Sequence, residues 1–249
     1  MNKKILNIEI EPLRKIDVLE KIKKYIGHFT YPLHIVSLNP ENLVLTTENL
    51  NFKRIVETAQ IKLIDGVGVV LAGRLLGVKV GERITGVTMM GELIELAGKM
   101  RLTVLLIGGK SDLALSLSKC QQEKYPQAKF FGLEGIKNIK NPKKEEEEAI
   151  FSIVRTARPN IVIVAFGSPE QELWLDRHNN KFSGIVCIGV GGAFDYFSGN
   201  IVHAPSIIRR FGLEWLFRLL IQPWRWRRQL RLIKFIWLVI KQKFGKRNS

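Results

Sequence analysis

Five short segments of this 249-residue sequence combine glycine with small polar side chains, and each follows a run of apolar or β-branched residues. Glycine lets backbone N–H groups approach a phosphate closely, and a helix that begins there adds partial positive charge. The carboxyl ends of strands in an open parallel sheet share one edge, so these segments are expected to meet in a pocket of the nucleotide-binding type. They are Ser37-Leu38-Asn39-Pro40, Asp65-Gly66, Gly108-Gly109-Lys110, Gly167–Gln171 and Gly189–Asp195.

Two residues in these segments have both a structural and a chemical interpretation. Asn39 precedes Pro40, which first indicates a helix N-cap with proline at the first helical position. Asp65 could likewise cap a helix that starts near Val67. However, an acid beside glycine at the carboxyl end of a strand is also where a general base would lie. Both interpretations of Asp65 stay open on pattern alone.

Four further polar residues have similar alternatives. Gln171 could donate its amide to a phosphate or simply begin a helix, and Asp195 could accept a ribose hydroxyl pair or cap a turn. Arg83 and Thr85 lie in the apparent loop GERITG, where an arginine is usually a solvated charge unless a phosphate is near.

The glycine-rich segments lack the best-known nucleotide motifs. Gly109 and Gly191 could each bring a backbone N–H group to a phosphate, or could form a tight strand-to-helix turn. Neither belongs to a full G-x-G-x-x-G or to a P-loop that ends in Gly-Lys-Ser/Thr. NAD or ATP binding by those motifs is therefore disfavoured.

The sequence predicts no metal site and no cofactor. It has no Asp-x-Asp, the pattern that commonly holds Mn²⁺ or Mg²⁺ on a pyrophosphate. Its two cysteines, Cys120 and Cys187, and its four histidines lack metal-type spacing. Arginines or helix dipoles would then have to balance the charge of a leaving group.

The elements that must position these residues alternate along the chain, which predicts the α/β class: a Rossmann-like, mostly parallel, doubly wound sheet covered by helices. The expected strands are Ile5–Ile10, His34–Leu38, Lys62–Ile64, Val104–Ile107, Lys129–Phe131, Ile161–Ala165 and Ile185–Ile188. The expected helices are Pro40–Glu48, Leu50–Ala59, Val67–Leu76, Met89–Lys99, Asp112–Lys124, Lys143–Thr156 and Gln171–Asn179.

The charge is unevenly distributed between the body and the end of the chain. The formal net charge is +16, and the stretch from Arg209 to Ser249 holds twelve Lys/Arg and one acid, a net of +11. We expect a catalytic body over residues 1–200 and a basic, amphipathic helical appendage over residues 201–249. An anionic partner, which could be lipid headgroups, nucleic acid or phosphates, is indicated for the appendage.

The appendage resembles an interfacial helix more than a nucleic-acid-binding arm or a helix packed on its own domain. After Pro223, basic residues share one side of the expected helix and apolar residues fill the other. Four of the five tryptophans lie in this tail, and no apolar run reaches about 18 residues. With no signal peptide evident, we expect a cytoplasmic protein that is peripheral on the inner face of the membrane and that could self-associate away from it.

Three arginines lie apart from that basic side. Arg218, Arg225 and Arg228 would share one face of a continuous helix, Pro223 permitting, and could reach back to an anionic ligand on the body.

Together these segments resemble the WecG/TagA/CpsF family of bacterial glycosyltransferases, in order from Ile8 to Phe235. The matching segments are SLNPENLVL, LIDGVGVV, RITGV, LLIGGK, FGSPEQELW, GVGGAFDYFSG, HAP and GLEWLFRLLIQPWRWRR. The resemblance implies an inverting, metal-independent transferase that moves N-acetylmannosamine from UDP to a polyprenyl-diphosphate-linked N-acetylglucosamine, in wall teichoic acid synthesis. Other members transfer N-acetylmannosaminuronic acid or build exopolysaccharides.

The resemblance also implies a role for each matching residue. Asp65 would be the general base that deprotonates the acceptor 4-hydroxyl, with Ser37 and Asn39 near the sugar and the base. Arg83, in the R-x-T-G loop that includes Thr85, would contact sugar or phosphate. Substrate contacts would also come from Gly109, Gln171, Gly191, Asp195, Arg218, Arg225 and Arg228, the three arginines closing over the diphosphate.

Two departures from the family pattern bear on donor or acceptor choice: Ile136 stands where tyrosine is frequent, and His203 replaces an arginine. The rival classes are a nucleic-acid-binding protein that uses the basic arm and a non-catalytic membrane scaffold. Neither needs polar residues at the ends of five strands, so the sequence favours the transferase and predicts no nucleic-acid partner.

Overall fold

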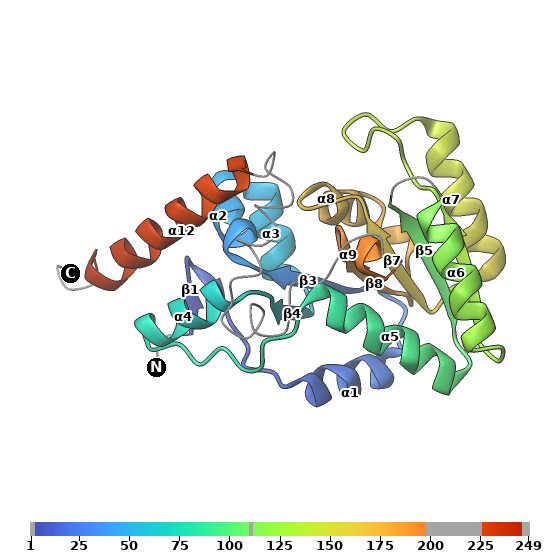
Figure 1. Ribbon diagram of the computed structural model, residues 1–249, viewed down its shortest axis with the longest axis horizontal. Helices are drawn as coiled ribbons and strands as arrows, with labels where there is room; N and C mark the ends of the chain where they lie inside the picture. The colour runs from blue at the N-terminus through green and yellow to red at the C-terminus, as the bar shows by residue number, and fades with distance from the viewer. Residues whose placement is uncertain (1–2, 110–111, 198–225, 246–249) are drawn as a thin grey trace.

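The computed structural model describes residues 3–109, 112–197 and 226–245, in which helices and strands alternate around one sheet (Figure 1). Six parallel strands form this sheet in the order β4-β3-β8-β7-β5-β6. The predicted α/β class with a parallel, helix-covered sheet is confirmed. The strands are β3 (Leu33–Leu38), β4 (Ile61–Ile64), β5 (Thr103–Gly108), β6 (Lys129–Leu133), β7 (Ile161–Ala165) and β8 (Val186–Gly189).

The order of the strands decides where a ligand can bind. The chain passes from β3 to β4 on one side and then crosses to β5 on the other, while β8 returns to pair with β3. In open α/β sheets the crevice for ligands lies at such a reversal, beyond the carboxyl ends of the strands. The ends of β3, β8 and β7 are therefore neighbours at the middle of this edge.

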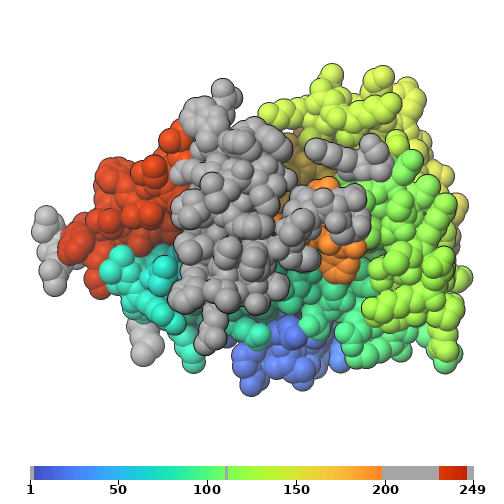
Figure 2. Space-filling view, in the orientation of Figure 1, coloured from blue at the N-terminus to red at the C-terminus, as the bar shows by residue number. Residues whose placement is uncertain are grey.

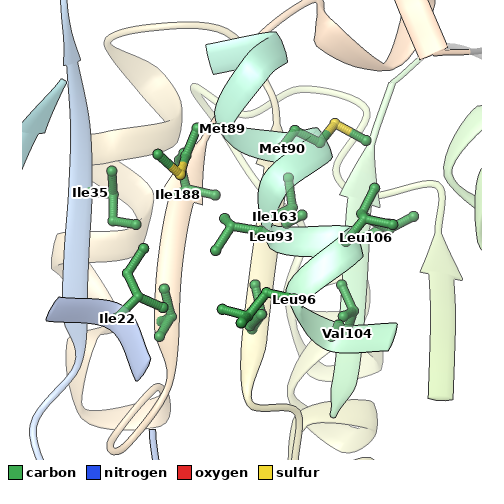
Figure 3. Close-up of a cluster of buried hydrophobic side chains, with 14 of the residues drawn as sticks. Ile22, Ile35, Met89, Met90, Leu93, Leu96, Val104, Leu106, Ile163 and Ile188 are labelled. Atoms are coloured by element: carbon green, nitrogen blue, oxygen red, sulfur yellow. The ribbon is translucent and has the colours of Figure 1, made fainter. Parts of the chain in front are cut away.

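Helices cover both faces of the sheet, which explains why the inner strands are apolar on both sides. One core includes residues of α1 (Lys15–Tyr25), α5 (Gly86–Met100), α6 (Leu113–Lys124) and α9 (Ala193–Phe197). Figure 3 shows its centre, where Met89 and Leu93 of α5 lie over Ile188 and Ile163 of the sheet. The opposite face is covered by α2 (Pro40–Glu48), α3 (Leu50–Thr58), α7 (Lys144–Ala157) and α8 (Glu170–Arg177).

The N-terminal segment differs from its prediction. The single strand expected over Ile5–Ile10 is wrong: β1 (Lys4–Ile5) and β2 (Ile8–Glu9) form an antiparallel pair. Leu6 and Asn7 between them both have positive φ, 47° and 67°. That conformation belongs to the tight two-residue turns whose twist matches a hairpin.

The helix α12 (Trp226–Gly245) lies along one end of the molecule, against α2 and α4 (Val67–Leu76) (Figure 1). Figure 2 shows it beside α4 on the surface. Phe235 and Val239 are buried in this contact. The Gln242 amide makes two hydrogen bonds with the backbone of the N-terminal hairpin. Its Oε1 accepts from Leu6 N at 2.8 Å, and its Nε2 donates to Lys4 O at 2.9 Å. The last described helix therefore completes the N-terminal hairpin.

Two cations of the basic side of α12 pair with acids of α2: Arg231 with Glu41 and Lys234 with Glu48, both at 2.7 Å. The surface of the helix also carries exposed apolar side chains, with between 45% and 65% of each exposed: Leu230, Ile233, Ile236, Trp237, Ile240 and Phe244. No helix in the described ranges is long and apolar enough to cross a bilayer.

Candidate active site

A pocket of about 380 Å³ lies at the carboxyl ends of β3, β5, β7 and β8. Its lining includes six residues that the sequence singled out: Ser37, Asn39, Gly109, Gln171, Gly191 and Asp195. It also includes residues that lie outside the segments expected from the sequence, among them Glu41, Asn42 and Glu172. The prediction that separate strand ends meet in one pocket is thus confirmed for these residues.

Ser37 and Asn39, at the end of β3, have different roles. Asn39 caps α2, because its Oδ1 accepts from Asn42 N at 2.8 Å, as its position before Pro40 indicated. The Ser37 Oγ, by contrast, is buried and has no hydrogen-bond partner within the described part of the chain. A buried hydroxyl without a partner is costly, so a group supplied by a ligand would satisfy it.

Asp65 lies beside the pocket and follows β4. Its backbone N–H donates to Leu38 O at 2.9 Å, and its Oδ2 accepts from Gly86 N, at the start of α5, at 3.3 Å. A Cβ at Gly86 would lie 3.7 Å from Ser37 Oγ and 4.0 Å from Asp65 Oδ2. The hydroxyl and the carboxylate therefore face the same point, where the α5 N-terminus favours negative charge. The cap of α4 is Gly66, so Asp65 is not the N-cap of that helix.

The loop with Arg83 and Thr85 runs alongside β4. Arg83 forms a parallel bridge with Ile64, and the next residue, Ile84, donates its N–H to Ile64 O at 2.8 Å. Thr85 caps α5, since its Oγ1 accepts from Thr88 N at 3.1 Å. The Arg83 side chain is exposed, next to the strand that carries Asp65.

Gln171 is buried and holds two loops together. Its Oε1 accepts from Gly167 N at 3.2 Å and from Gly191 N at 3.0 Å, while its Nε2 donates to Glu172 Oε1 at 2.8 Å. A Cβ at Gly189 would lie only 2.3 Å from that Nε2, so glycine is required for Gln171 to fit. The sequence left open an amide that binds phosphate or a residue that begins a helix. Gln171 lies in the first turn of α8, and its amide ties the β7 and β8 loops.

The lining is unusually acidic for a site that would take an anionic ligand. Glu41, Glu172 and Asp195 contribute carboxyl groups, whereas no Lys or Arg in the described part of the chain lines the pocket. Arg231 neutralises Glu41 at 2.7 Å. Burial raises the pKa of Glu172 to about 7 against the opposing effect of the hydrogen bond from Gln171.

Three predicted arginines cannot be placed in this site. Arg218 and Arg225 lie outside the described residues, and of Arg228 only its position near the start of α12 is described. In the ranges that are described, no three His, Cys, Asp or Glu residues come together as a metal site.

The pocket lies where open α/β sheets bind their ligands, and comparison with known proteins identifies the class of protein. The family model described as "Glycosyl transferase WecG/TagA/CpsF family" matches residues 3–249. The chain belongs to this family and is a hexosyltransferase.

The chain is also similar to three curated proteins, each named N-acetylglucosaminyldiphosphoundecaprenol N-acetyl-beta-D-mannosaminyltransferase. The one from Bacillus subtilis (strain 168) is 32% identical over 235 residues, which cover 94% of this chain and 88% of that protein. The one from Bacillus spizizenii is 29% identical and covers 95% and 93%, respectively. The one from Staphylococcus aureus (strain NCTC 8325) is 29% identical and covers 92% and 87%.

Proposed function

We propose that this chain transfers N-acetylmannosamine from UDP-N-acetylmannosamine to a polyprenyl-diphosphate-linked N-acetylglucosamine, in assembly of the wall teichoic acid linkage unit. The observation that carries the proposal is the point where Ser37 Oγ, Asp65 Oδ2 and the α5 N-terminus face one another beside the strand-end pocket. The names of the three relatives supply the donor sugar and the acceptor.

In the proposed reaction Asp65 acts as the general base. Its carboxylate takes the proton of the acceptor 4-hydroxyl while that oxygen attacks the anomeric carbon from the face opposite UDP. The bond from the anomeric carbon to UDP breaks, UDP leaves with the electron pair, and the configuration inverts. Ser37 would bond the sugar or the incoming hydroxyl, since its own Oγ has no protein partner in the described structure.

The leaving diphosphate would be stabilised without a metal ion, which the absence of Asp-x-Asp in the sequence supports. Backbone N–H groups at Gly109 and Gly191 would approach the donor, and Asp195 would bond the nucleoside. Arg83, with Thr85 fixing the start of α5, would reach the sugar or phosphate. Because the described lining has no cationic side chain, Arg218, Arg225 and Arg228 would supply positive charge over the diphosphate.

The appendage over residues 201–249 would hold the enzyme on the cytoplasmic leaflet, where a polyprenyl-linked acceptor resides. Supporting this, α12 presents a row of exposed apolar side chains that includes Ile233, Trp237 and Phe244. Arg231 and Lys234 are engaged with acids of α2, which removes two cations from any nucleic-acid-binding arm.

The enzymatic proposal is tested by ligand binding and by transfer. UDP and UDP-N-acetylmannosamine should raise the unfolding temperature in the presence of EDTA, with about 2.7 kcal/mol of added stability at 100 times the dissociation constant. ATP and NAD are the matched negative ligands. With a short-chain prenyl-diphosphate N-acetylglucosamine in liposomes, the product should be an inverted disaccharide lipid. Absence of both binding and transfer, with liposomes present, would contradict the function.

The membrane proposal has a separate test. Replacing both Ile233 and Trp237 with alanine should weaken binding to anionic liposomes roughly 30-fold, because about 2 kcal/mol of apolar burial in the lipid is lost. Leu50→Ala is the control, since Leu50 is 81% exposed but lies on α3. Equal liposome binding by the double variant and the wild type would refute α12 as the docking face.

A further inference from the structure

Glu172 is a fully buried carboxyl group in the wall of the pocket, and nothing in the proposed reaction uses it. It lies on α8, is 1% exposed and borders the pocket beside Gln171. Its Oε1 accepts from Gln171 Nε2 at 2.8 Å, but its Oε2 is buried with no hydrogen-bond partner. An ionised carboxylate in such a place would be expensive, because no cation in the described residues compensates it.

The Ser168 hydroxyl, on the loop beside Glu172, already uses its hydrogen elsewhere. It donates to Asn42 Oδ1 at 3.0 Å, and Asn42 Nδ2 in turn donates to the backbone carbonyl of Ser37 at 2.8 Å. A hydroxyl has one hydrogen to donate, so Ser168 has none left for Glu172. An ionised Glu172 therefore gains no hydrogen bond from Ser168, and its Oε2 stays without a donor among the described residues.

The other oxygen of Glu172 acts through Gln171. Since Gln171 Oε1 accepts from the N–H groups of Gly167 and Gly191, its Nε2 must point toward Glu172. Glu172 thus fixes the amide that joins the loops after β7 and β8. Ser168, in the β7 loop, is linked through Asn42 to the end of β3, where Ser37 lies.

The protonation state of Glu172 matters for the binding of an anionic ligand because the pocket already carries acidic side chains. Glu41 and Asp195 already line it, Arg231 pairs with Glu41, and no Lys or Arg of the described chain joins the lining. An ionised Glu172 would add a negative charge where an anionic diphosphate has to bind. A neutral Glu172 adds none.

We propose that Glu172 is a positioning residue, buried as a neutral carboxylic acid, which holds Gln171 so that the β7 and β8 loops stay spaced for the donor diphosphate. This inference rests on the proposed function for the identity of the ligand. It makes donor binding pH-dependent: affinity falls as Glu172 ionises. Besides its hydrogen-bond partners, Glu170 on the same helix is the charged group acting on it, and Glu170 itself faces Lys140 at 3.8 Å.

The first test needs no ligand. The pKa of Glu172 is raised to about 7 from an ordinary 4.5. The stability that its neutral form contributes is therefore complete when the pH is below 4.5, and it is lost as the pH rises to about 7. Glu172→Gln has the same shape as the neutral acid and cannot ionise. Across that window the urea midpoint of the wild type should fall relative to that of Glu172→Gln. A difference that does not change with pH would overturn the neutral state.

The second test measures the dissociation constant of UDP-N-acetylmannosamine, whose diphosphate is esterified at both ends and keeps a constant charge over the range. Wild-type affinity should fall about tenfold between pH 6 and pH 8, whereas Glu172→Gln should keep the low-pH affinity throughout. Glu172→Leu should bind weakly at every pH, because the Gln171 amide loses its acceptor. A Glu172→Gln variant with the wild-type pH profile would overturn the positioning role.

The control is Glu170→Gln, which removes the neighbouring carboxylate outside the buried chain of hydrogen bonds and should retain the wild-type fall in affinity. The two proposals fail in different ways. No binding of the nucleotide sugar at any pH, together with the expected shift of the urea midpoint, would contradict the proposed function while leaving the neutral Glu172 in place.

Discussion

The polar groups on the two sides of the pocket differ in whether they are hydrogen-bonded to the protein. Around Gln171, the amide bonds three protein groups: two backbone N–H groups and Glu172. Around Ser37, the hydroxyl is also buried but has no partner among the described residues. On the Gln171 side the hydrogen bonds hold two loops in place. On the Ser37 side a buried hydroxyl near Asp65 is left for a ligand to bond.

This difference separates the scaffold of the site from its reactive part. Buried polar groups in proteins are nearly always hydrogen-bonded. A cluster whose hydrogen bonds are all made within the protein therefore indicates a structural role, and a buried hydroxyl without a protein partner indicates a role in binding. Substitutions on the two sides should therefore move different quantities: stability on the Gln171 side, turnover on the Ser37 and Asp65 side.

The largest effect is expected at Asp65. Asp65→Asn removes the base but keeps an oxygen for Gly86 N, so turnover should fall by about 10²- to 10⁴-fold while UDP affinity changes little. Single-turnover transfer and calorimetric titration with UDP would measure the two quantities. Asp176→Asn is the control, a carboxylate that pairs with Arg54 instead. Near-wild-type turnover of Asp65→Asn would remove Asp65 as the base.

Gln171→Leu should act mainly on the fold. It leaves the N–H groups of Gly167 and Gly191 and the Glu172 Oε1 without their partner, at a cost of about 2 kcal/mol in the free energy of unfolding. Urea denaturation would measure this. A variant of unchanged stability but lost donor affinity would mean that Gln171 contacts substrate directly, and the contrast between the two sides would disappear.

The smallest effect, and the sharpest contrast, is expected at Ser37. Because its hydroxyl has no protein partner, Ser37→Ala should change the free energy of unfolding by less than about 0.5 kcal/mol. The loss of one hydrogen bond to a ligand should still lower kcat/KM by roughly 3- to 10-fold. Urea denaturation and steady-state kinetics on the same preparation would separate the two. A marked loss of stability would show that Ser37 has a structural duty.

The architecture could be predicted because its signals are local. Buried parallel strands such as β5 and β7 are continuous apolar runs, and α2 begins at an Asn-Pro cap, so both patterns predicted their elements. The helix Lys15–Tyr25 was not predicted, although Val18, Ile22 and Tyr25 give the helical spacing of its buried face. The hairpin at Leu6-Asn7 was missed because an alternating apolar pattern conceals a turn.

The pocket-lining residues at strand ends could be predicted for a similar reason: parallel strands place their carboxyl ends together. Glu172 could not. In the segment Glu170-Gln171-Glu172 a carboxylate is normally a solvated residue of a helix start, and only the packing of α8 buries the second of the two. The pairing of Arg231 with Glu41 was equally inaccessible, since it joins residues 190 apart in the chain.

The hydrogen bonds of the Gln242 side chain affect when the N-terminal hairpin can be completed as the chain is synthesised. It supplies a donor and an acceptor to β1, and its bond to Leu6 closes a separation of 236 residues. The hairpin therefore waits for a helix that is synthesised 236 residues later, and β3 likewise waits for β8. A chain synthesised only as far as β8 cannot complete this end of the molecule, so the exposed face of α12 takes its final orientation only after the whole α/β body has been translated.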